Sequence, residues 1–294
     1  MIDAIRTVQL SKAFHSEIAV NNISLALPKD KIYGLLGRNG AGKTTLLHLM
    51  ASQYIPTEGE VTILGESVYE NREVLSNICF IPGFTKHVHA YRVKDFLATA
   101  ASFYPNWDQA FADELLETFE LSPKKKYKEL SAGMVSMLSI IISMASRAPV
   151  TLLDEPYTGL DATARHLFYD LLADDFAKNP RTIVFSTHLI DEASRLFEDV
   201  ILIDKGSLIF HQPIEVLEEQ SFTISGQTSI IEHALSTKNI IHKEALGNTT
   251  HVAIFDHLTK QEMTALMEAG IQVSKLSLQQ LFVYLTAKRK GDSV

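Results

Sequence analysis

Short stretches in which apolar and polar residues alternate dominate the first part of the chain. "TVQL" and "ISLAL" predict strands, and "IYGLLG" is an apolar run that leads directly into a glycine-rich turn. "GKTTLLHLMAS" then has helical spacing, and "GEVTIL" returns to a strand pattern. The pattern predicts a β-rich start with one helix directly behind a glycine-rich loop.

From about Tyr91 to Ala148 the periodicity becomes almost wholly helical, as in "VKDFLATAASFY" and "DQAFADELLETFEL". Strand-like runs return at "VTLLD", "TIVFS", "VILID" and "SLIF". Such runs between helices are typical of an α/β protein with a parallel sheet. We therefore expect a first domain at 1–215, with a helical subdomain inserted at about 88–148.

The segment 216–294 follows a pattern of its own. "SFTIS" predicts a strand, Ser229–Glu232 predicts a capping box, and "GN" between "IIHKEAL" and "THVAIF" predicts a hairpin. Thr259–Glu262 predicts a second capping box, "IQVSKL" a strand, and Ser277–Gln280 the start of a last helix. The order βαββαβ plus a helix predicts a small α+β domain of the ferredoxin-like arrangement.

Composition and charge narrow the class of protein. With 294 residues, 46% hydrophobic and 21% charged, the chain is an ordinary globular protein with room for two domains. Its net charge of −8 argues against broad nucleic-acid binding, so we expect no nucleic-acid partner. Cys79 is the only cysteine, which fits a reducing cytoplasm. The most apolar run, "MLSIIISMA", is far shorter than the roughly 20 residues that span a bilayer.

The glycine-rich loop has the spacing of a phosphate-binding loop. "GRNGAGKTT", Gly37–Thr45, fits G-x-x-x-x-G-K-[ST] between a predicted strand and a predicted helix. Its glycines let successive N–H groups face a β-phosphate, Lys43 would reach the β- and γ-phosphates, and Thr44 would hold Mg²⁺. The alternative is a plain glycine-rich turn before a helix. The candidate ATP-binding residues of the loop are Gly37, Asn39, Gly40, Ala41, Gly42, Lys43, Thr44 and Thr45.

Two strand ends supply candidate catalytic groups. "VTLLDEP" ends in two carboxylates, of which Asp154 would hold Mg²⁺, directly or through water, and Glu155 would polarise the attacking water. His188, which follows the strand "TIVFS", is placed to contact a γ-phosphate. The alternatives are an acidic turn after a buried strand, and a histidine that is simply packed or exposed.

A second candidate anion site lies at "LSAGM", where Ser131, Ala132 and Gly133 open a long apolar helix. A helix start built of small residues offers unpaired backbone N–H groups, which suit an anion. A plain N-cap at Ser131 is the alternative.

The motifs "GRNGAGKTT", "LSAGM", "LLDEP", "GLD" and "STH", in that order, resemble the nucleotide-binding subunit of ATP-binding cassette (ABC) transporters over about residues 1–215. "FYPNWD" and the C-terminal domain are further similar to a bacterial subgroup, the YtrB-like exporter ATPases. The resemblance implies a P-loop NTPase with a RecA-like parallel core and an antiparallel β subdomain. It also implies ATP and Mg²⁺ as cofactors and a peripheral place on the cytoplasmic face of the cell membrane.

The same resemblance implies roles for residues and partners. Two cassettes, in a homodimer or a mixed pair, would pack head to tail around two Mg-ATP and drive separate transmembrane permease subunits of an exporter. Ser131 and Gly133 would then donate to the γ-phosphate bound on the partner chain. Asp161 of "GLD" would reach across the interface. Phe14 would stack on adenine, with a core phenylalanine as the alternative.

Three positions depart from the family pattern. Gly83 stands where the family usually has a glutamine near Mg²⁺, and Ala132 and Met134 replace the usual glycine and glutamine of the signature. The loop Gly83–Arg92 is expected to contact a membrane partner, with a solvated loop as the alternative. Two other functions stay open: a soluble ABC ATPase acting on ribosomes or DNA, and a regulatory cassette that binds ATP without turnover.

Overall fold

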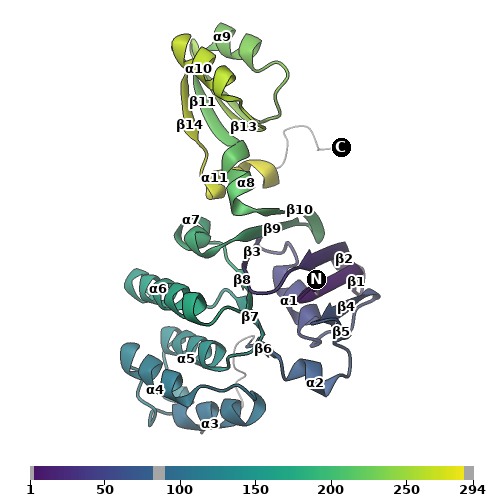
Figure 1. Cartoon of the computed structure of the whole chain (residues 1–294), viewed down its shortest axis with the longest axis vertical. Coiled ribbons are helices and arrows are strands. Elements are labelled where there is room, and N and C mark those ends of the chain that lie inside the picture. The colour runs from purple at the N-terminus through teal and green to yellow at the C-terminus, as the bar shows by residue number, and fades with distance from the viewer. Residues whose placement is uncertain (1–2, 82–89, 288–294) are drawn as a thin grey trace. The chain divides into compact units, whose positions relative to one another are not determined.

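The computed structural model describes residues 3–81 and 90–287 (Figure 1). The chain divides into two compact units, Met1–His211 and Gln212–Val294. Gly83 and most of the loop expected to contact a membrane partner lie outside the described residues.

The first unit begins with an antiparallel sheet in the order β2-β1-β4-β5. Its strands are β1 (Ile5–Phe14), β2 (Glu17–Leu27), β4 (Glu58–Ile63) and β5 (Glu66–Ser67). Buried and exposed residues alternate along the second half of β2, as expected for a sheet with one face toward a core. The strands predicted at the start of the chain are therefore confirmed.

The second sheet of this unit has six strands in the order β10-β9-β3-β8-β7-β6. The pairs from β9 to β6 are all parallel. Both β3 and β8 are buried along their whole length, because a parallel sheet is covered on both faces. The strands are β3 (Ile32–Leu36), β6 (Ile78–Phe80), β7 (Val150–Asp154), β8 (Thr182–Ser186), β9 (Asp199–Asp204) and β10 (Ser207–Pro213).

Helix α1 (Lys43–Met50) joins the two sheets through a shared core. It contacts β2 and β4 of the antiparallel sheet and β7 of the parallel sheet. Leu46 and Leu47 are fully buried there, and each contributes about 1.5–3 kcal/mol through loss of apolar contact with water. The helix is thereby held firmly behind the loop that precedes it.

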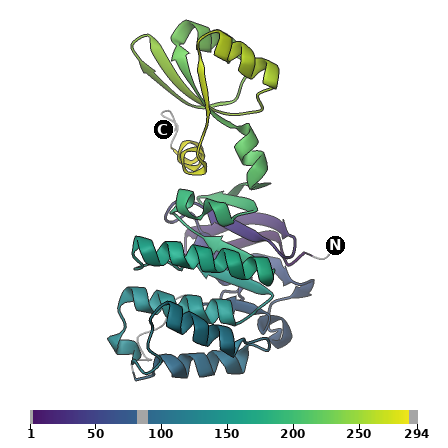
Figure 2. The same ribbon diagram turned by 60° about the vertical axis from the view of Figure 1, so that its left-hand side comes forward.

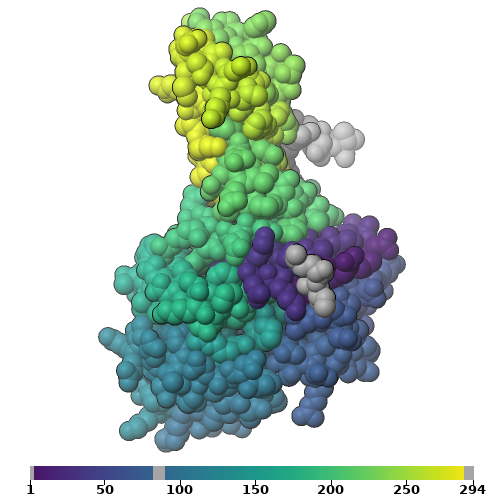
Figure 3. Space-filling model, in the orientation of Figure 1, coloured from purple at the N-terminus to yellow at the C-terminus, as the bar shows by residue number. Residues whose placement is uncertain are grey.

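The helical insert consists of α3 (Val93–Phe103), α4 (Gln109–Thr118) and α5 (Ala132–Ala145), and α5 contacts both other helices. Figure 2 shows them lying side by side, with α6 (Ala162–Lys178) next to α5. In Figure 3 the antiparallel strands and the insert occupy opposite sides of the first unit. Shorter helical turns are α2 (Arg72–Leu75), Tyr127–Glu129, α7 (Ile190–Ala193) and Ser194–Leu196.

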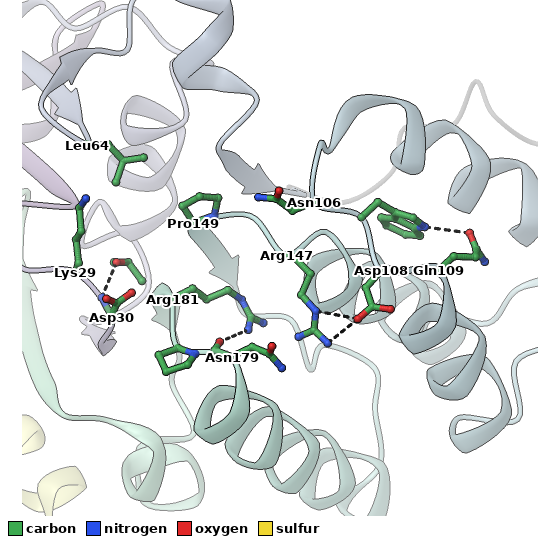
Figure 4. A pocket seen from close by; sticks show the side chains of 13 residues that line it. Lys29, Asp30, Leu64, Asn106, Asp108, Gln109, Arg147, Pro149, Asn179 and Arg181 are labelled. Atoms are coloured by element: carbon green, nitrogen blue, oxygen red, sulfur yellow. Dashed lines mark hydrogen bonds and ion pairs between the residues drawn. The ribbon is translucent and has the colours of Figure 1, made fainter.

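A largely buried ionic cluster ties the insert to the parallel sheet, and Figure 4 shows its Arg147–Asp108 pair and Arg181. Arg147, just past α5, donates to Asp108 at the start of α4 over 3.0 Å and also pairs with Asp175 of α6. Asp175 in turn accepts from Arg181, just before β8, over 2.9 Å. Asp175 is 4% and Arg181 5% exposed, so the carboxylate is the counter-ion of two guanidinium groups.

The second unit contains a four-stranded antiparallel sheet in the order β12-β13-β11-β14. The order of elements after α8 is βαββαβ plus a helix, as expected from the sequence, and the unit is a small α+β domain. Its elements are α8 (Ile214–Gln220), β11 (Ser221–Gln227), α9 (Thr228–Ala234), β12 (Ile240–Leu246), β13 (Thr249–Phe255), α10 (Lys260–Glu268), β14 (Gln272–Lys275) and α11 (Leu278–Thr286).

Local signals in this unit are mostly confirmed. The hairpin at "GN" pairs Leu246 with Thr249, Thr259–Glu262 is a capping box, and Ser277 caps α11. The capping box predicted at Ser229–Glu232 is wrong, because α9 begins two residues earlier, after Gln227. The Thr228 hydroxyl and N–H both donate to the Asn248 carbonyl of the hairpin, which fixes the helix start there.

Candidate functional site

The glycine-rich loop connects β3 to α1 and has a backbone that only glycine adopts readily. Gly40 and Gly42 have φ angles of 80° and 102°. A Cβ on Gly42 would lie 2.2 Å from the Ala19 carbonyl oxygen. No side chain caps the first turn of α1. The helix therefore presents its N-terminal N–H groups to the loop, an arrangement that suits a phosphate.

Lys43 is 6% exposed and lies folded back over the loop. Its Nζ donates to the carbonyl oxygens of Gly37 (2.7 Å) and Arg38 (3.3 Å). Burial lowers the pKa of Lys43, and the nearby Glu155 and Asp154 carboxylates oppose that shift. An ammonium group has three protons, so one donor remains for a phosphate oxygen.

Asp154, at the end of β7, connects three segments. Its Oδ2 accepts from the Thr44 hydroxyl over 2.7 Å, and its Oδ1 accepts from the Ser186 hydroxyl over 2.6 Å. Thr44 and Asp154 thus bring two oxygen ligands together, and Mg²⁺ prefers oxygen ligands while keeping several waters and phosphate oxygens. Within residues 3–81 and 90–287, no cluster of three or more His, Cys, Asp or Glu side chains could hold a metal ion. The two oxygens of Thr44 and Asp154 fit a Mg²⁺ ion that takes its other ligands from water and a nucleotide.

Glu155 and His188 meet beside Asp154. Glu155 Oε2 lies 3.2 Å from His188 Nδ1. The Glu155 backbone has a φ of 45°, in the left-handed region, and its N–H donates to the Ser186 hydroxyl over 3.1 Å. The structure thus brings together the two groups predicted to be catalytic.

A cavity of about 560 Å³ collects most of the candidate nucleotide-binding groups. Phe14 lies at its edge, 39% exposed, with its ring 5.4 Å from that of Tyr54. The Lys12 ammonium lies 5.1 Å from the centre of the Phe14 ring. Because the ring is exposed, the alternative of a core phenylalanine does not hold. The lining residues are Phe14, Glu17, Ala19, Asn39, Gly40, Ala41, Gly42, Lys43, Thr44, Thr45, Asp154 and Glu155.

Ser131, Ala132, Gly133 and Asp161 are not part of this lining. Ser131 caps α5 by accepting from the Met134 N–H over 3.2 Å, and Asp161 caps α6 by accepting from the Ala164 N–H over 2.8 Å. A Cβ on Gly133 would lie 2.6 Å from the Gly159 carbonyl oxygen, so glycine lets these two helix starts approach closely. Ser131 and Ala132 are exposed, which leaves them accessible to another molecule.

Comparison with known proteins identifies the family. A sequence profile described as "ABC transporter" matches residues 20–158. The ABC transporter ATP-binding protein YtrB of Bacillus subtilis (strain 168) is 32% identical over 216 residues, 74% of this chain and 74% of that protein. This chain belongs to the ABC transporter family, among its ATP-binding proteins. The resemblance carried by the five ordered motifs is confirmed.

Other similar proteins have names that state a transport role. The bacitracin transport ATP-binding protein BcrA of Bacillus licheniformis is 28% identical over 294 residues, 95% of this chain and 94% of that protein. The Nod factor export ATP-binding protein I of Burkholderia lata is 33% identical over 206 residues, 68% of this chain and 67% of that protein.

Solved structures share the fold of the cassette. An ATP-binding subunit of an ABC transporter aligns with a TM-score of 0.66 at 21% identity, over 74% of this chain and 92% of that one. A dimeric ATP-binding cassette in a post-hydrolysis state, bound to ADP and Pi, aligns with a TM-score of 0.62 at 22% identity. The alignment covers 71% of this chain and 98% of that one. No helix in the described part of this chain is long and apolar enough to cross a membrane.

Three polar residues of the site were not predicted from the ABC motifs. Ser186 holds Asp154, and Thr187 and Tyr157 surround His188. Ser186 and Thr187 belong to the quoted motif "STH", and Tyr157 follows "DEP", so the signal was their adjacency to motif residues. Their contacts arise because the parallel strands β7 and β8 end side by side. The sequence alone does not show which strands are neighbours in the sheet.

A larger cavity, of about 840 Å³, lies elsewhere in the cassette (Figure 4). It is bounded by Asp30, Pro149 and Arg181, which precede β3, β7 and β8. It therefore lies at the amino ends of the parallel strands. Ligands of such sheets bind at the carboxyl ends, where the phosphate loop, Asp154 and His188 are found.

Proposed function

We propose that this chain is the ATP-binding and ATP-hydrolysing subunit of an exporter, which works as a dimer of cassettes and drives separate membrane subunits. The observation that carries the proposal is the meeting of phosphate loop, Thr44–Asp154 pair and Glu155–His188 pair at one end of the parallel sheet. The relative named for Nod factor export supports export as the direction of transport. The relative named for bacitracin transport supports a role in a transporter.

In this proposal different groups of the chain bind different parts of the nucleotide. Phe14 stacks on the base, and the N–H groups of the loop and the ammonium of Lys43 hold the β- and γ-phosphates. Thr44 and Asp154 would hold Mg²⁺, which when bound neutralises phosphate charge. The Thr44–Asp154 hydrogen bond keeps both oxygens in place beforehand.

Hydrolysis needs a water aligned with the γ-phosphate and a group to accept its proton. The Glu155 carboxylate orients and polarises this water, and His188 donates a hydrogen bond to the γ-phosphate. The bond from the Glu155 N–H to Ser186 fixes the backbone that carries the carboxylate. Because these groups are preorganised, little rearrangement is needed when the nucleotide arrives.

The second copy completes the site in this proposal. Ser131 and Gly133 lie at the exposed start of α5, outside the cavity that holds their own chain's phosphate loop. They are proposed to donate to the γ-phosphate of the facing cassette, with Asp161 crossing the interface. A cassette of the same fold that was solved as a dimer with ADP and Pi supports the association of two copies.

The decisive experiment is to tag this chain in its native cell and identify what copurifies from gently solubilised membranes. We expect a multi-span membrane protein at a ratio of about one to one. A matched control is the tagged Lys43→Ala variant, which should copurify the same protein because docking does not need ATP. Recovery only from the soluble fraction, with ribosomes or nucleic acid, would contradict the transport assignment.

A further inference from the structure

Tyr157 is a buried residue beside the proposed catalytic histidine, with no role in the nucleotide chemistry described above. It is 3% exposed and lies in the turn after β7. Its hydroxyl oxygen is 2.9 Å from Thr187 Oγ1, 2.9 Å from the backbone nitrogen of His188 and 3.1 Å from His188 Nδ1. One hydroxyl thus contacts both the backbone and the ring of His188.

One arrangement of these hydrogen bonds gives every hydroxyl proton an acceptor. Thr187 Oγ1 accepts from the Leu189 N–H over 2.9 Å, which leaves its own proton free to point at Tyr157. The His188 N–H also donates to the Tyr157 oxygen. When Thr187 donates, both acceptor positions of that oxygen are filled and the Tyr157 proton points at His188 Nδ1. The reverse direction would leave the proton of the fully buried Thr187 hydroxyl without an acceptor among the described residues, so the first arrangement is favoured. Burial raises the pKa of Tyr157, so the hydroxyl keeps this proton at neutral pH.

The same ring nitrogen faces a competing group. His188 Nδ1 lies 3.2 Å from Glu155 Oε2 and 3.1 Å from the Tyr157 hydroxyl. If Nδ1 carried the proton of the neutral ring, it would donate to Glu155 and occupy an oxygen of the proposed base. If Nδ1 accepts from Tyr157, the ring proton is on Nε2, and the carboxylate is left for water.

We propose that Tyr157 is a positioning residue that holds neutral His188 in the Nε2–H tautomer, so that the ring donates from Nε2 while Glu155 stays available to the attacking water. The inference rests on the proposed function for its link to hydrolysis. The tautomer itself is a property of the nucleotide-free chain and can be measured without any activity.

The test compares wild type with Tyr157→Phe and with Tyr169→Phe as the matched control. Tyr169 is fully buried, its ring contacts Phe185 as that of Tyr157 does, and its hydroxyl has no hydrogen-bond partner among the described residues. Long-range ¹H–¹⁵N correlation spectra of the histidine rings report the tautomer, with His188 assigned by its loss in His188→Ala. Spectra are recorded at a pH at which the ring is neutral.

We expect the Nε2–H pattern in wild type and in Tyr169→Phe, and a shift toward Nδ1–H in Tyr157→Phe. Loss of one buried hydrogen bond should lower kcat for ATP hydrolysis about tenfold in Tyr157→Phe, with KM within about twofold. Tyr169→Phe should retain wild-type kinetics.

An Nδ1–H pattern in wild type would overturn the inference, and this measurement needs no variant to fold. An unchanged tautomer in a folded Tyr157→Phe would overturn it as well. A shifted tautomer with unchanged kcat would support the hydrogen bond from Tyr157 but contradict the role that the proposed function gives to His188.

Discussion

Glu155 has a backbone conformation that residues with a Cβ seldom adopt. Its φ of 45° is in the left-handed region, which costs a non-glycine residue about 1–2 kcal/mol. The two bonds from its N–H to Ser186 hold that conformation in place. Strain of this kind is kept where the surroundings fix a side chain for function.

Replacing Glu155 tests this strain directly. We expect Glu155→Gly to be more stable than Glu155→Ala by about 1 kcal/mol, because only glycine adopts this φ without steric cost. Both variants should lose hydrolysis by about 100-fold or more, since both lack the carboxylate. Urea unfolding compares the two stabilities, and a phosphate-release assay compares the rates. Equal stability of the two variants would mean that the backbone of Glu155 is unstrained.

At the scale of elements, an ionic cluster joins α4, α5, α6 and β8. Asp175 is the shared counter-ion of Arg147 and Arg181, and all three side chains are largely buried. Removing one member of such a cluster leaves buried charges without compensation, which is far more costly than losing an exposed ion pair.

We therefore expect Asp175→Asn to lower the free energy of unfolding of the cassette by about 3 kcal/mol. The matched control is Asp174→Asn, at an exposed position one residue earlier on the same helix. This substitution should change the free energy of unfolding by less than about 0.5 kcal/mol. Denaturant unfolding measures both. A similar small effect of the two substitutions would show that the buried cluster does not stabilise the fold.

The capping box of α10 couples the stability of the second unit to pH. Bonds from Lys238 and from the Thr259 N–H and hydroxyl lower the pKa of Glu262 from its ordinary value of 4.5 to about 2. A carboxyl group whose pKa is lowered in the folded state stabilises that state at pH values above its ordinary pKa of 4.5. This stabilisation is lost as the pH falls from about 4.5 toward 2.

We expect Glu262→Gln to weaken protection of the α10 amides against hydrogen exchange at pH 7, and the difference from wild type to shrink below pH 4.5. Glu268→Gln, at the exposed end of the same helix, is the control and should have little effect at either pH. Thr259→Ala, which removes the cap, should cost about 1 kcal/mol. A Glu262→Gln difference that persisted unchanged at pH 3 would contradict the lowered pKa.

At the scale of the whole molecule, the proposed function requires two copies. Ser131 is exposed and lies outside the cavity of its own phosphate loop, and in the proposed function it contacts the nucleotide that another chain binds. Binding of ATP and association of two cassettes are then one linked equilibrium.

We expect Glu155→Gln, which blocks hydrolysis but leaves binding intact, to form a dimer with Mg-ATP, measured by light scattering at high protein concentration. Adding Ser131→Asp should abolish the dimer while the monomer still binds ATP. Aspartate retains the N-cap of α5 but places a negative charge toward the facing γ-phosphate. A Glu155→Gln variant that stays monomeric would contradict the dimer model.

Much of the fold and site could be predicted because the signals are local. Strand-to-helix spacing around "GRNGAGKTT", two carboxylates at a strand end and the turn residues "GN" each act within a few positions of the chain. The same reasoning missed α2, α7 and α8, which are short and lack a clear period. It also misplaced the start of α9, because a tertiary hydrogen bond from Thr228 outweighed the local cap at Ser229.

The sequence by itself determined the family, the order of the longer elements and the chemical groups of the nucleotide site, since all three depend on residue type and spacing. Only the tertiary structure decided which groups meet. Thr44 and Asp154 are 110 residues apart in sequence and hydrogen-bonded in space, and Tyr157 reaches His188 from the turn after the neighbouring strand β7. Such contacts follow from the order of parallel strands, which is set by long-range packing and leaves no periodicity in the chain.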